Sequence, residues 1–372
     1  RTLWQRIEPA TLPLLYDPAL GDITVVLVPG IYGELFDGEL WQRGLRSVRE
    51  RLGVRTFTVR ADGRCSAAIN AGTLRQALRD DTRRRLERGY RTPRYLLIGY
   101  SKGGVDATEA LLADSALAAK QIAALVTVAT PHLGSPVAER AELPAPLLSW
   151  ASRDTMPTAC AADGAAPSLF PATRRAFWAE HAETIGTRTR LFSIAFVSDV
   201  HDAHPWMKIT KQVGQFTEPN DGVVALSAAR FPVEVPSIHL GTINGDHIAG
   251  INASAFPQEA FMESIVLTLG ELGALDRDRD TTWRDAQRRW ASSPVNRTAA
   301  ASRAPAFAQS LRARAALPGG SAGWTPTATF RLLEANSVQD RGIRAMSPAA
   351  HPDGYTLRCD QRDLGEFRRE YE

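Results

Sequence analysis

The sequence predicts an α/β fold in which helices cover both faces of a mostly parallel sheet. Apolar, β-branched segments alternate along the chain with segments of helical character, as in a sheet built from strand–helix–strand units. The apolar segments are continuous, which is typical of strands buried on both faces. With 372 residues, of which 44% are hydrophobic and 23% charged, the chain has an ordinary globular composition.

The individual elements follow from these runs. The predicted strands are 22–28, 55–59, 94–99, 123–129 and 191–197, and the predicted helices are 39–52, 73–89, 104–118 and 255–272. A further apolar run at 238–243 lies before the last of these helices.

Two segments depart from this alternation. Residues 136–188 contain several prolines and large apolar side chains, which favours a lid or substrate-binding cap over a plain connector packed on the sheet. After residue 272 the composition shifts towards Ala, Arg, Pro, Ser and Gly. We therefore expect a main domain at 1–272 and a C-terminal extension at 273–372, with a short helix near 283–290 and strands near 327–333 and 355–358.

Composition also limits the function classes. The formal net charge is +3 and acidic and basic residues are interspersed, so no nucleic-acid partner is expected. Cys65, Cys160 and Cys359 allow one disulfide and lack the spacing of a metal site. No apolar run is long enough for a transmembrane segment. No signal peptide is visible, but the chain begins with Arg1, so its compartment stays open.

A serine nucleophile is predicted where an apolar run ends in G-x-S-x-G. The motif consists of Gly99, Ser101 and Gly103, and a helix-forming segment follows it. In this context the serine sits on a sharp strand-to-helix turn that exposes its hydroxyl. Larger side chains at the glycines would collide, since strand and helix pass closely there. The alternative is a glycine-rich turn that carries an ordinary serine.

A serine hydroxyl needs a base, and the base needs an orienting acid. His247 lies in a turn-rich loop that follows a late apolar run, where functional loops of a parallel sheet gather. His239 lies within that run and is expected to be structural. Asp221, in the tight turn P-N-D-G, is the favoured acid. Asp199, at the end of the strand predicted at 191–197, is the alternative.

Two backbone N–H groups are expected to bind the oxyanion. One belongs to Lys102, directly after the nucleophile, and the other to Ile31 in the loop after the first strand. Gly30 and Gly33 let that loop turn its N–H groups inwards. The alternative of a phosphate-binding loop fails because no Lys-Ser/Thr pair follows the glycines.

Taken together, these segments resemble an α/β-hydrolase-fold serine lipase or esterase, similar to the bacterial triacylglycerol lipases and the lecithin–cholesterol acyltransferase type. The resemblance covers about residues 20–272. It rests on P-G-I-Y-G at 29–33, G-Y-S-K-G at 99–103, T-P-H-L-G-S at 130–135, N-D-G-V-V at 220–224 and G-D-H at 245–247. The resemblance implies a structural role for His132.

The chain also departs from this family. Lys102 stands where lipases often carry Met or Gln; we expect its side chain to point to solvent, although a cation there would favour an anionic substrate. Ala249 stands where the bacterial lipases often have a calcium-binding aspartate, so neither calcium nor any other metal or cofactor is expected.

The predicted function is hydrolysis of carboxylic esters through a Ser101–His247–Asp221 triad and an acyl-enzyme intermediate. An acyltransferase, a phospholipase or an amidase would use the same groups, and a non-catalytic binding protein is the alternative from another class. The substrate is expected to be a small-molecule or lipid ester, with transient lipid-surface contact through the cap. The residues expected to contact it are Tyr32, Tyr100, Trp150 and Phe170.

Overall fold

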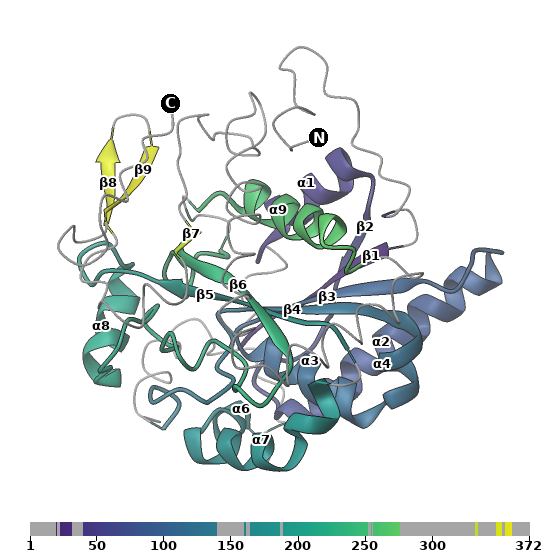
Figure 1. Ribbon diagram of the computed structural model, residues 1–372, viewed down its shortest axis with the longest axis horizontal. Coiled ribbons are helices and arrows are strands. Elements are labelled where there is room, and N and C mark those ends of the chain that lie inside the picture. Colours follow the sequence, from purple (N-terminus) through teal and green to yellow (C-terminus); the bar gives the residue numbers. More distant parts are fainter. Residues whose placement is uncertain are drawn as a thin grey trace.

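The computed structural model describes residues 20, 23–31, 40–139, 160, 164–186, 189–251, 254, 256–275, 332–333, 347–351 and 354–358. Within this part of the chain, a seven-stranded sheet has the order β2-β1-β3-β4-β5-β6-β7. All neighbouring strands are parallel except β6 and β7, which are antiparallel. The predicted α/β fold is therefore confirmed (Figure 1).

The strands coincide with the predicted apolar runs to within one residue at most ends. Every residue of β1, β3, β4 and β5 is buried, as expected for strands covered on both faces. The strands are β1 (Ile23–Val28), β2 (Arg55–Thr58), β3 (Arg94–Tyr100), β4 (Ile122–Val128), β5 (Leu191–Val197), β6 (Ser237–Asn244) and β7 (Leu332–Leu333).

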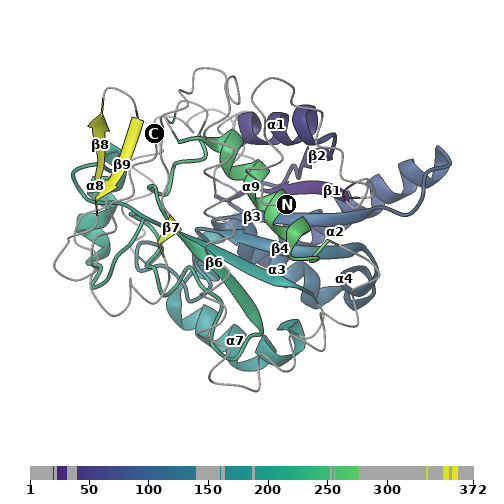
Figure 2. The ribbon, with the colours of Figure 1, turned by 45° about the horizontal axis from the view of Figure 1, so that its top comes forward.

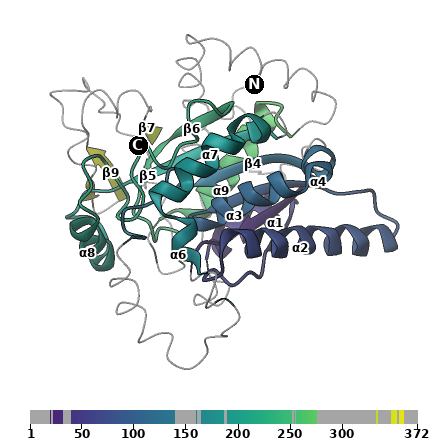
Figure 3. The ribbon, with the colours of Figure 1, turned by 90° about the horizontal axis from the view of Figure 1, so that it is seen from below.

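Helices cover both faces of the sheet. α1 (Gln42–Leu52) and α9 (Gln258–Glu271) lie together on one face (Figures 1 and 2). The opposite face carries α2 (Ala67–Glu87), α3 (Lys102–Ala113), α4 (Ser115–Gln121) and α7 (Pro171–Gly186), as Figure 3 shows. The remaining described helices are α6 (Ala165–Ser168) and α8 (Pro205–Gly214).

Side chains that alternate along the strands build one apolar core on each face. In β3, Leu96 and Ile98 join the core under α1 and α9, whereas Tyr95 and Leu97 join the core under α2 and α3. The first core is rich in aromatic rings and includes the fully buried Phe261. Burial of one such side chain contributes about 1.5–3 kcal/mol to the stability of the fold.

The strand register aligns the carboxyl ends of the parallel strands at one edge of the sheet. The loops that follow the strands therefore meet there, as functional loops do in open α/β sheets. The aligned pairs near this edge are Val28 with Gly99, Tyr100 with Val128, and Val197 with Asn244.

Two helix boundaries differ from the predicted ones because of side-chain caps. α2 begins at Ala67, six residues earlier than predicted, because the Ser66 side chain accepts a hydrogen bond from the N–H of Ile69. The helix predicted at 104–118 is divided into α3 and α4, since Asp114 ends the first and caps the second through the N–H of Leu117. The helices α7 and α8 were not predicted.

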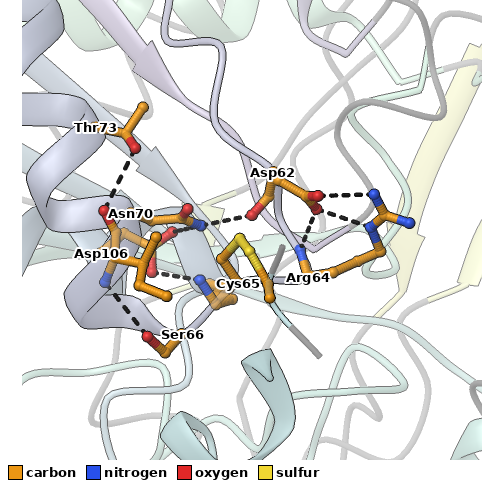
Figure 4. The surroundings of a disulfide bond; sticks show 10 residues. Asp62, Arg64, Cys65, Ser66, Asn70, Thr73 and Asp106 are labelled. Atoms are coloured by element: carbon orange, nitrogen blue, oxygen red, sulfur yellow. Dashed lines mark hydrogen bonds and ion pairs between the residues drawn. A yellow bond between two sulfur atoms is a disulfide. The ribbon is translucent and has the colours of Figure 1, made fainter. Parts of the chain in front are cut away.

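The predicted cap at 136–188 is described only in part. α7 packs on the main domain, where Trp178 and Ile185 are buried in the core under α2 and α3. A disulfide joins Cys160 to Cys65 in the loop between β2 and α2 (Figure 4). The N–H of Ala165 donates to the carbonyl of Arg64 at 2.7 Å. Residues 140–159, 161–163, 187 and 188 lie outside the described residues.

The edge strand β7 pairs with β6 and lies within the strand predicted at 327–333. A separate antiparallel pair consists of β8 (Ser347–His351) and β9 (Gly354–Arg358), the latter overlapping the strand predicted at 355–358. The helix predicted near 283–290 lies outside the described residues. No described helix combines the length and the apolar character needed to cross a bilayer.

Candidate active site

Ser101 occupies the sharp turn between β3 and α3. Its backbone has φ 53° and ψ −129°, a conformation that L-residues adopt only when their surroundings enforce it. Gly103 makes the turn compatible with its neighbours, because a Cβ atom there would lie 2.0 Å from the carbonyl oxygen of Val28. The G-x-S-x-G segment therefore has the strand–turn–helix context that the nucleophile motif requires.

The loop after β1 lies directly against this serine. A Cβ atom on Gly30 would lie 2.7 Å from the Cβ and 3.2 Å from the Oγ of Ser101. Ile31 follows and packs, half-buried, against the apolar cluster formed by Ala67, Val105 and Leu169. The loop that was expected to supply the second oxyanion donor is therefore adjacent to the hydroxyl, while Tyr32 and Gly33 lie outside the described residues.

Three predicted residues meet at the carboxyl edge of the sheet. Ser101 Oγ lies 2.8 Å from His247 Nε2, and His247 Nδ1 lies 2.7 Å from Asp221 Oδ2. They come from the β3–α3 turn, the loop after β6 and the loop after α8, so 120 residues separate Ser101 from Asp221 in sequence and 26 separate Asp221 from His247. This is the hydrogen-bonded sequence of nucleophile, base and orienting acid.

The Asp221 carboxylate is held in place by the backbone of its own turn. Its Oδ1 accepts the N–H groups of Val223 at 2.9 Å and Val224 at 2.7 Å. The N–H of His247 donates to the Asp221 carbonyl at 2.9 Å, which fixes the two loops together. From α8, Lys211 Nζ donates to the carbonyl of Asn220 at 2.8 Å and to its Oδ1 at 2.9 Å, and so braces the same turn.

Tyr100 supports His247 from below. Its hydroxyl donates to the His247 carbonyl, and the two rings stack with their centroids 5.7 Å apart. Burial raises the pKa of Tyr100 well above its ordinary value, so the hydroxyl stays a neutral donor. Tyr100 was expected to contact substrate. It is only 4% exposed, and its hydroxyl is directed at the backbone of the loop that carries His247.

The alternative acid and the alternative base have other partners. The Asp199 carboxylate accepts the N–H of His201 at 2.8 Å, as a turn-capping aspartate does. His239 Nδ1 lies 3.0 Å from Ser193 Oγ, and its Nε2 lies 3.3 Å from Thr242 Oγ1. Burial lowers the pKa of His239 well below its ordinary value, and no carboxylate pairs with it among the described residues.

His132 lies in the loop after β4 and is completely buried. Its Nε2 lies 2.8 Å from Thr127 Oγ1, its carbonyl accepts the indole N–H of Trp178 at 2.7 Å, and its ring packs on Phe231. These contacts are those of a structural histidine that joins β4 to α7.

The expectation that the Lys102 side chain points to solvent is wrong. The side chain is 0% exposed, and its Nζ lies 2.6 Å from Asp106 Oδ1 one helical turn away. The i, i+4 spacing of Lys102 and Asp106 on a predicted helix is the sequence signal that could have revealed the pair. The ammonium is buried and paired with Asp106, so it does not bind an anionic substrate.

The remaining predicted substrate contacts are only partly described. Phe170 is half-buried at the start of α7, next to Leu169, which packs against Ile31. Trp150 lies outside the described residues. Sequence reasoning missed the roles of Lys211 and Tyr100, because both depend on contacts between separate elements. It also missed Asp106, although the spacing from Lys102 was present in the sequence.

Comparison with solved structures bears on the fold. The metagenomic carboxyl esterase MGS0156 superposes with a TM-score of 0.56 at 28% identity, covering 70% of this chain and 78% of the esterase. The mature lipase BlEst2 of Bacillus licheniformis gives a TM-score of 0.50 at 21% identity, with 65% and 91% covered. The chain has an α/β-hydrolase fold. Neither the protein-family models nor the curated proteins gave a match to this α/β-hydrolase chain.

Proposed function

We propose that this chain, a carboxylic ester hydrolase of the lipase and esterase type, acts through a triad of Ser101, His247 and Asp221. The observation that carries the proposal is the pair of hydrogen bonds on His247, at 2.8 Å to Ser101 Oγ and at 2.7 Å to Asp221 Oδ2. The likeness to a carboxyl esterase supports ester bonds as the substrate class. A small-molecule or lipid ester fits both neighbours' names.

The reaction follows from the positions of the three side chains. Ser101 Oγ attacks the ester carbonyl carbon while its proton passes to His247 Nε2. Asp221 accepts the Nδ1–H of His247, keeps the ring in the tautomer with a free Nε2, and stabilises the imidazolium. His247 then gives its proton to the leaving alkoxide, which departs as the alcohol and leaves an acyl group on Ser101. A water then gives a proton to His247 as its oxygen bonds to the acyl carbon. The carbon–oxygen bond to Ser101 breaks, Ser101 Oγ takes the proton back from His247, and the free acid is released.

The negative charge on the carbonyl oxygen needs donors that are already oriented. The N–H of Lys102 lies at the first turn of α3, where helix N–H groups are free of intrahelical partners. The loop at Gly30 and Ile31 lies against Ser101 from the other side. We assign the two oxyanion donors to the backbone of Ile31 and Lys102. We also propose that the segment at 136–188 contacts the acyl part of the substrate and, for lipid esters, the lipid surface.

Hydrolysis of p-nitrophenyl esters, with acyl chains from acetyl to palmitoyl, tests the proposal in the wild type and in Ser101→Ala. We expect the variant to lose activity by about 10⁴-fold or more. The matched control is Ser193→Ala, which removes the hydroxyl of another Ser–His pair, the partly buried one with His239, and should retain activity. A fluorophosphonate probe should label the wild type and not Ser101→Ala. Comparable activity in Ser101→Ala and wild type would refute the nucleophile.

The same assay separates hydrolysis from acyl transfer. Products are analysed with and without an added alcohol as second acceptor. Release of the free acid at an unchanged rate supports a hydrolase. Quantitative transfer to the added alcohol would instead indicate an acyltransferase that uses the same triad.

A further inference from the structure

A buried network of polar side chains lies beneath the nucleophile. Lys102 Nζ is 2.6 Å from Asp106 Oδ1, and the two side chains are 0% and 1% exposed. The other carboxylate oxygen, Oδ2, accepts a hydrogen bond from Asn70 Nδ2 of α2 at 3.0 Å. Asn70 also donates to the carbonyl of Asp62 at 3.0 Å, in the turn before Cys65 (Figure 4). The network therefore joins the residue after Ser101 to the loop that carries the disulfide.

The energetics of this pair do not explain its presence as a stabilising contact. The ammonium belongs to the first turn of α3, where the helix dipole disfavours a cation. Both charges lose their hydration, and apolar side chains of similar volume often stabilise a protein as well or better. Burial raises the pKa of Asp106 to about 7 even though Lys102 and Asn70 act in the opposite direction. Desolvation therefore outweighs the attraction at this carboxyl group.

What the network does achieve is to fix the orientation of residue 102. Lys102 follows the strained Ser101, whose φ is 53°. Such a backbone persists only where neighbouring contacts determine it more than once. Anchoring the side chain of Lys102 to Asp106, and Asp106 to α2 through Asn70, restrains the rotation of the peptide group between residues 101 and 102. That peptide carries the N–H assigned to the oxyanion.

We propose that Lys102 and Asp106, held by Asn70, are positioning residues that aim the backbone N–H of Lys102 at the oxyanion. The proposal rests on the proposed function, because the direction of this donor affects the rate only if Ser101 is the nucleophile. The proposal explains why Lys102 stands where lipases often carry Met or Gln. The lysine serves the geometry of the reacting site and does not bind a charged substrate.

The ionisation of Asp106 gives the proposal a distinctive pH dependence. The charged groups that act on Asp106 are Lys102 and Glu109 of α3, and Arg174 of α7 through its field, while the neutral Asn70 faces it from α2. Below about pH 7 the carboxyl group takes up a proton and its pairing with Lys102 weakens. Below that pH the wild type has a neutral side chain at position 106, as Asp106→Asn has at every pH. Above that pH only the wild type has the charged pair.

The test compares wild type, Asp106→Asn and Lys102→Met/Asp106→Asn by kcat, KM and the rate of fluorophosphonate labelling. Well above pH 7 we expect kcat and the labelling rate to fall about tenfold or more in both variants, with KM within about twofold. The double variant keeps the test valid if Asp106→Asn alone fails to fold, since it leaves no unpaired buried charge. The ratio of wild-type to Asp106→Asn kcat should converge towards one as the pH falls below 7.

Two control variants remove carboxylates that are not part of the network. Glu109→Gln changes the other acidic residue of α3, which pairs with Arg174 at 3.1 Å. Glu263→Gln changes a buried carboxylate of α9, on the opposite face of the sheet, that pairs with Arg51 at 3.0 Å. Both controls should keep kcat within about threefold of the wild type. Glu263→Gln, which does not act on Asp106, should also follow the wild-type pH profile.

The outcomes separate the positioning role from the proposed function. If Ser101→Ala is inactive but both network variants react and label at the wild-type rate, the positioning role is overturned and the proposed function stands. A wild-type to Asp106→Asn ratio of about one well above pH 7, where the pair is charged in the wild type, also overturns it. If Ser101→Ala remains active, the proposed function fails and the positioning role fails with it.

Discussion

The regions around His132 and His247 show two uses of a buried histidine at the same edge of the sheet. Both side chains follow a strand, and each makes a 2.8 Å hydrogen bond through Nε2 to a hydroxyl oxygen, of Thr127 and of Ser101 respectively. They differ on the other side of the ring. His247 Nδ1 faces Asp221 at 2.7 Å, whereas His132 Nδ1 has no hydrogen-bond partner among the described residues.

Exposure and charge separate the two sites further. The His247 side chain is 11% exposed, while His132 is entirely covered, in part by Trp178 and Phe231. Burial, with a smaller contribution from Arg174, lowers the pKa of His132 well below its ordinary value, so this ring stays neutral. A hydroxyl–histidine contact is thus common to both, and only the carboxylate and the access to solvent favour proton transfer at His247.

The largest expected effect is that of His247→Ala. Without the base, Ser101 remains protonated, and we expect kcat to fall by about 10⁴- to 10⁶-fold while the protein stays folded. Steady-state hydrolysis of a p-nitrophenyl ester and a thermal melt measure the two quantities. If His247→Ala kept more than about a tenth of the activity, His247 would not be the base, and the contrast with His132 would no longer hold.

Asp221→Asn tests the partner that distinguishes His247. An amide at this position favours the wrong tautomer of the ring and cannot stabilise the imidazolium, so kcat should fall by about 10⁴-fold. The matched control is Asp199→Asn, at the acid whose carboxylate caps the N–H of His201, and it should change kcat by less than about threefold. Equal losses in the two variants, measured as kcat at saturating substrate, would contradict the assignment.

His132→Ala should act on stability and leave the chemistry intact. The substitution opens a cavity beside Trp178 and Phe231 and should lower the free energy of unfolding by about 2–4 kcal/mol. The kcat per folded molecule should stay within about threefold. Urea unfolding measures the first quantity. Thr127→Val is the control that keeps the ring in place and removes the hydroxyl, with its hydrogen bonds to His132 Nε2 and to the Phe192 carbonyl, at about 1 kcal/mol for each bond. A large loss of kcat in soluble, folded His132→Ala would show that this histidine takes part in the reaction.

The smallest effect concerns pH. In the unfolded chain His132 takes up a proton as the pH falls below about 6.5, but in the folded protein its pKa is lowered. The unfolded state therefore binds more protons below about pH 6.5, and the stability contributed by the neutral ring is lost as the pH falls. The difference in unfolding free energy between wild type and His132→Ala should shrink between pH 7 and pH 5. A constant difference would mean that His132 is not kept neutral by burial.

The sequence was most informative where a local pattern fixes a backbone conformation. Continuous apolar runs located β1, β3, β4 and β5 because strands covered on both faces have no polar side to interrupt them. Helix boundaries were less predictable. α2 starts early because Ser66 caps it, and α3 ends at Asp114, and such caps can be recognised only when the competing turns are known.

Local pattern also failed for contacts made across elements. The helix α7, which was not predicted, lies within the segment predicted as a cap. Its Trp178 donates to the carbonyl of His132, which lies 46 residues away, so its packing could not be read from local sequence. Lys102 pairs with Asp106, and Asp106 is in turn held by Asn70 of α2. The contact with α2 cannot be read from local sequence, and the Lys102 side chain was therefore predicted to point to solvent.

The sequence by itself determined the fold class and the turn that carries Ser101. It also supplied two candidates for the base and two for the acid. These depend on residue order and on short-range steric limits. The tertiary structure alone brought His247 and Asp221 to Ser101, gave Asp199 and His239 other partners, and buried Lys102 under the nucleophile. The physical reason is that hydrogen bonds between loops depend on how the parallel strands are aligned, and that alignment is a property of the packed sheet.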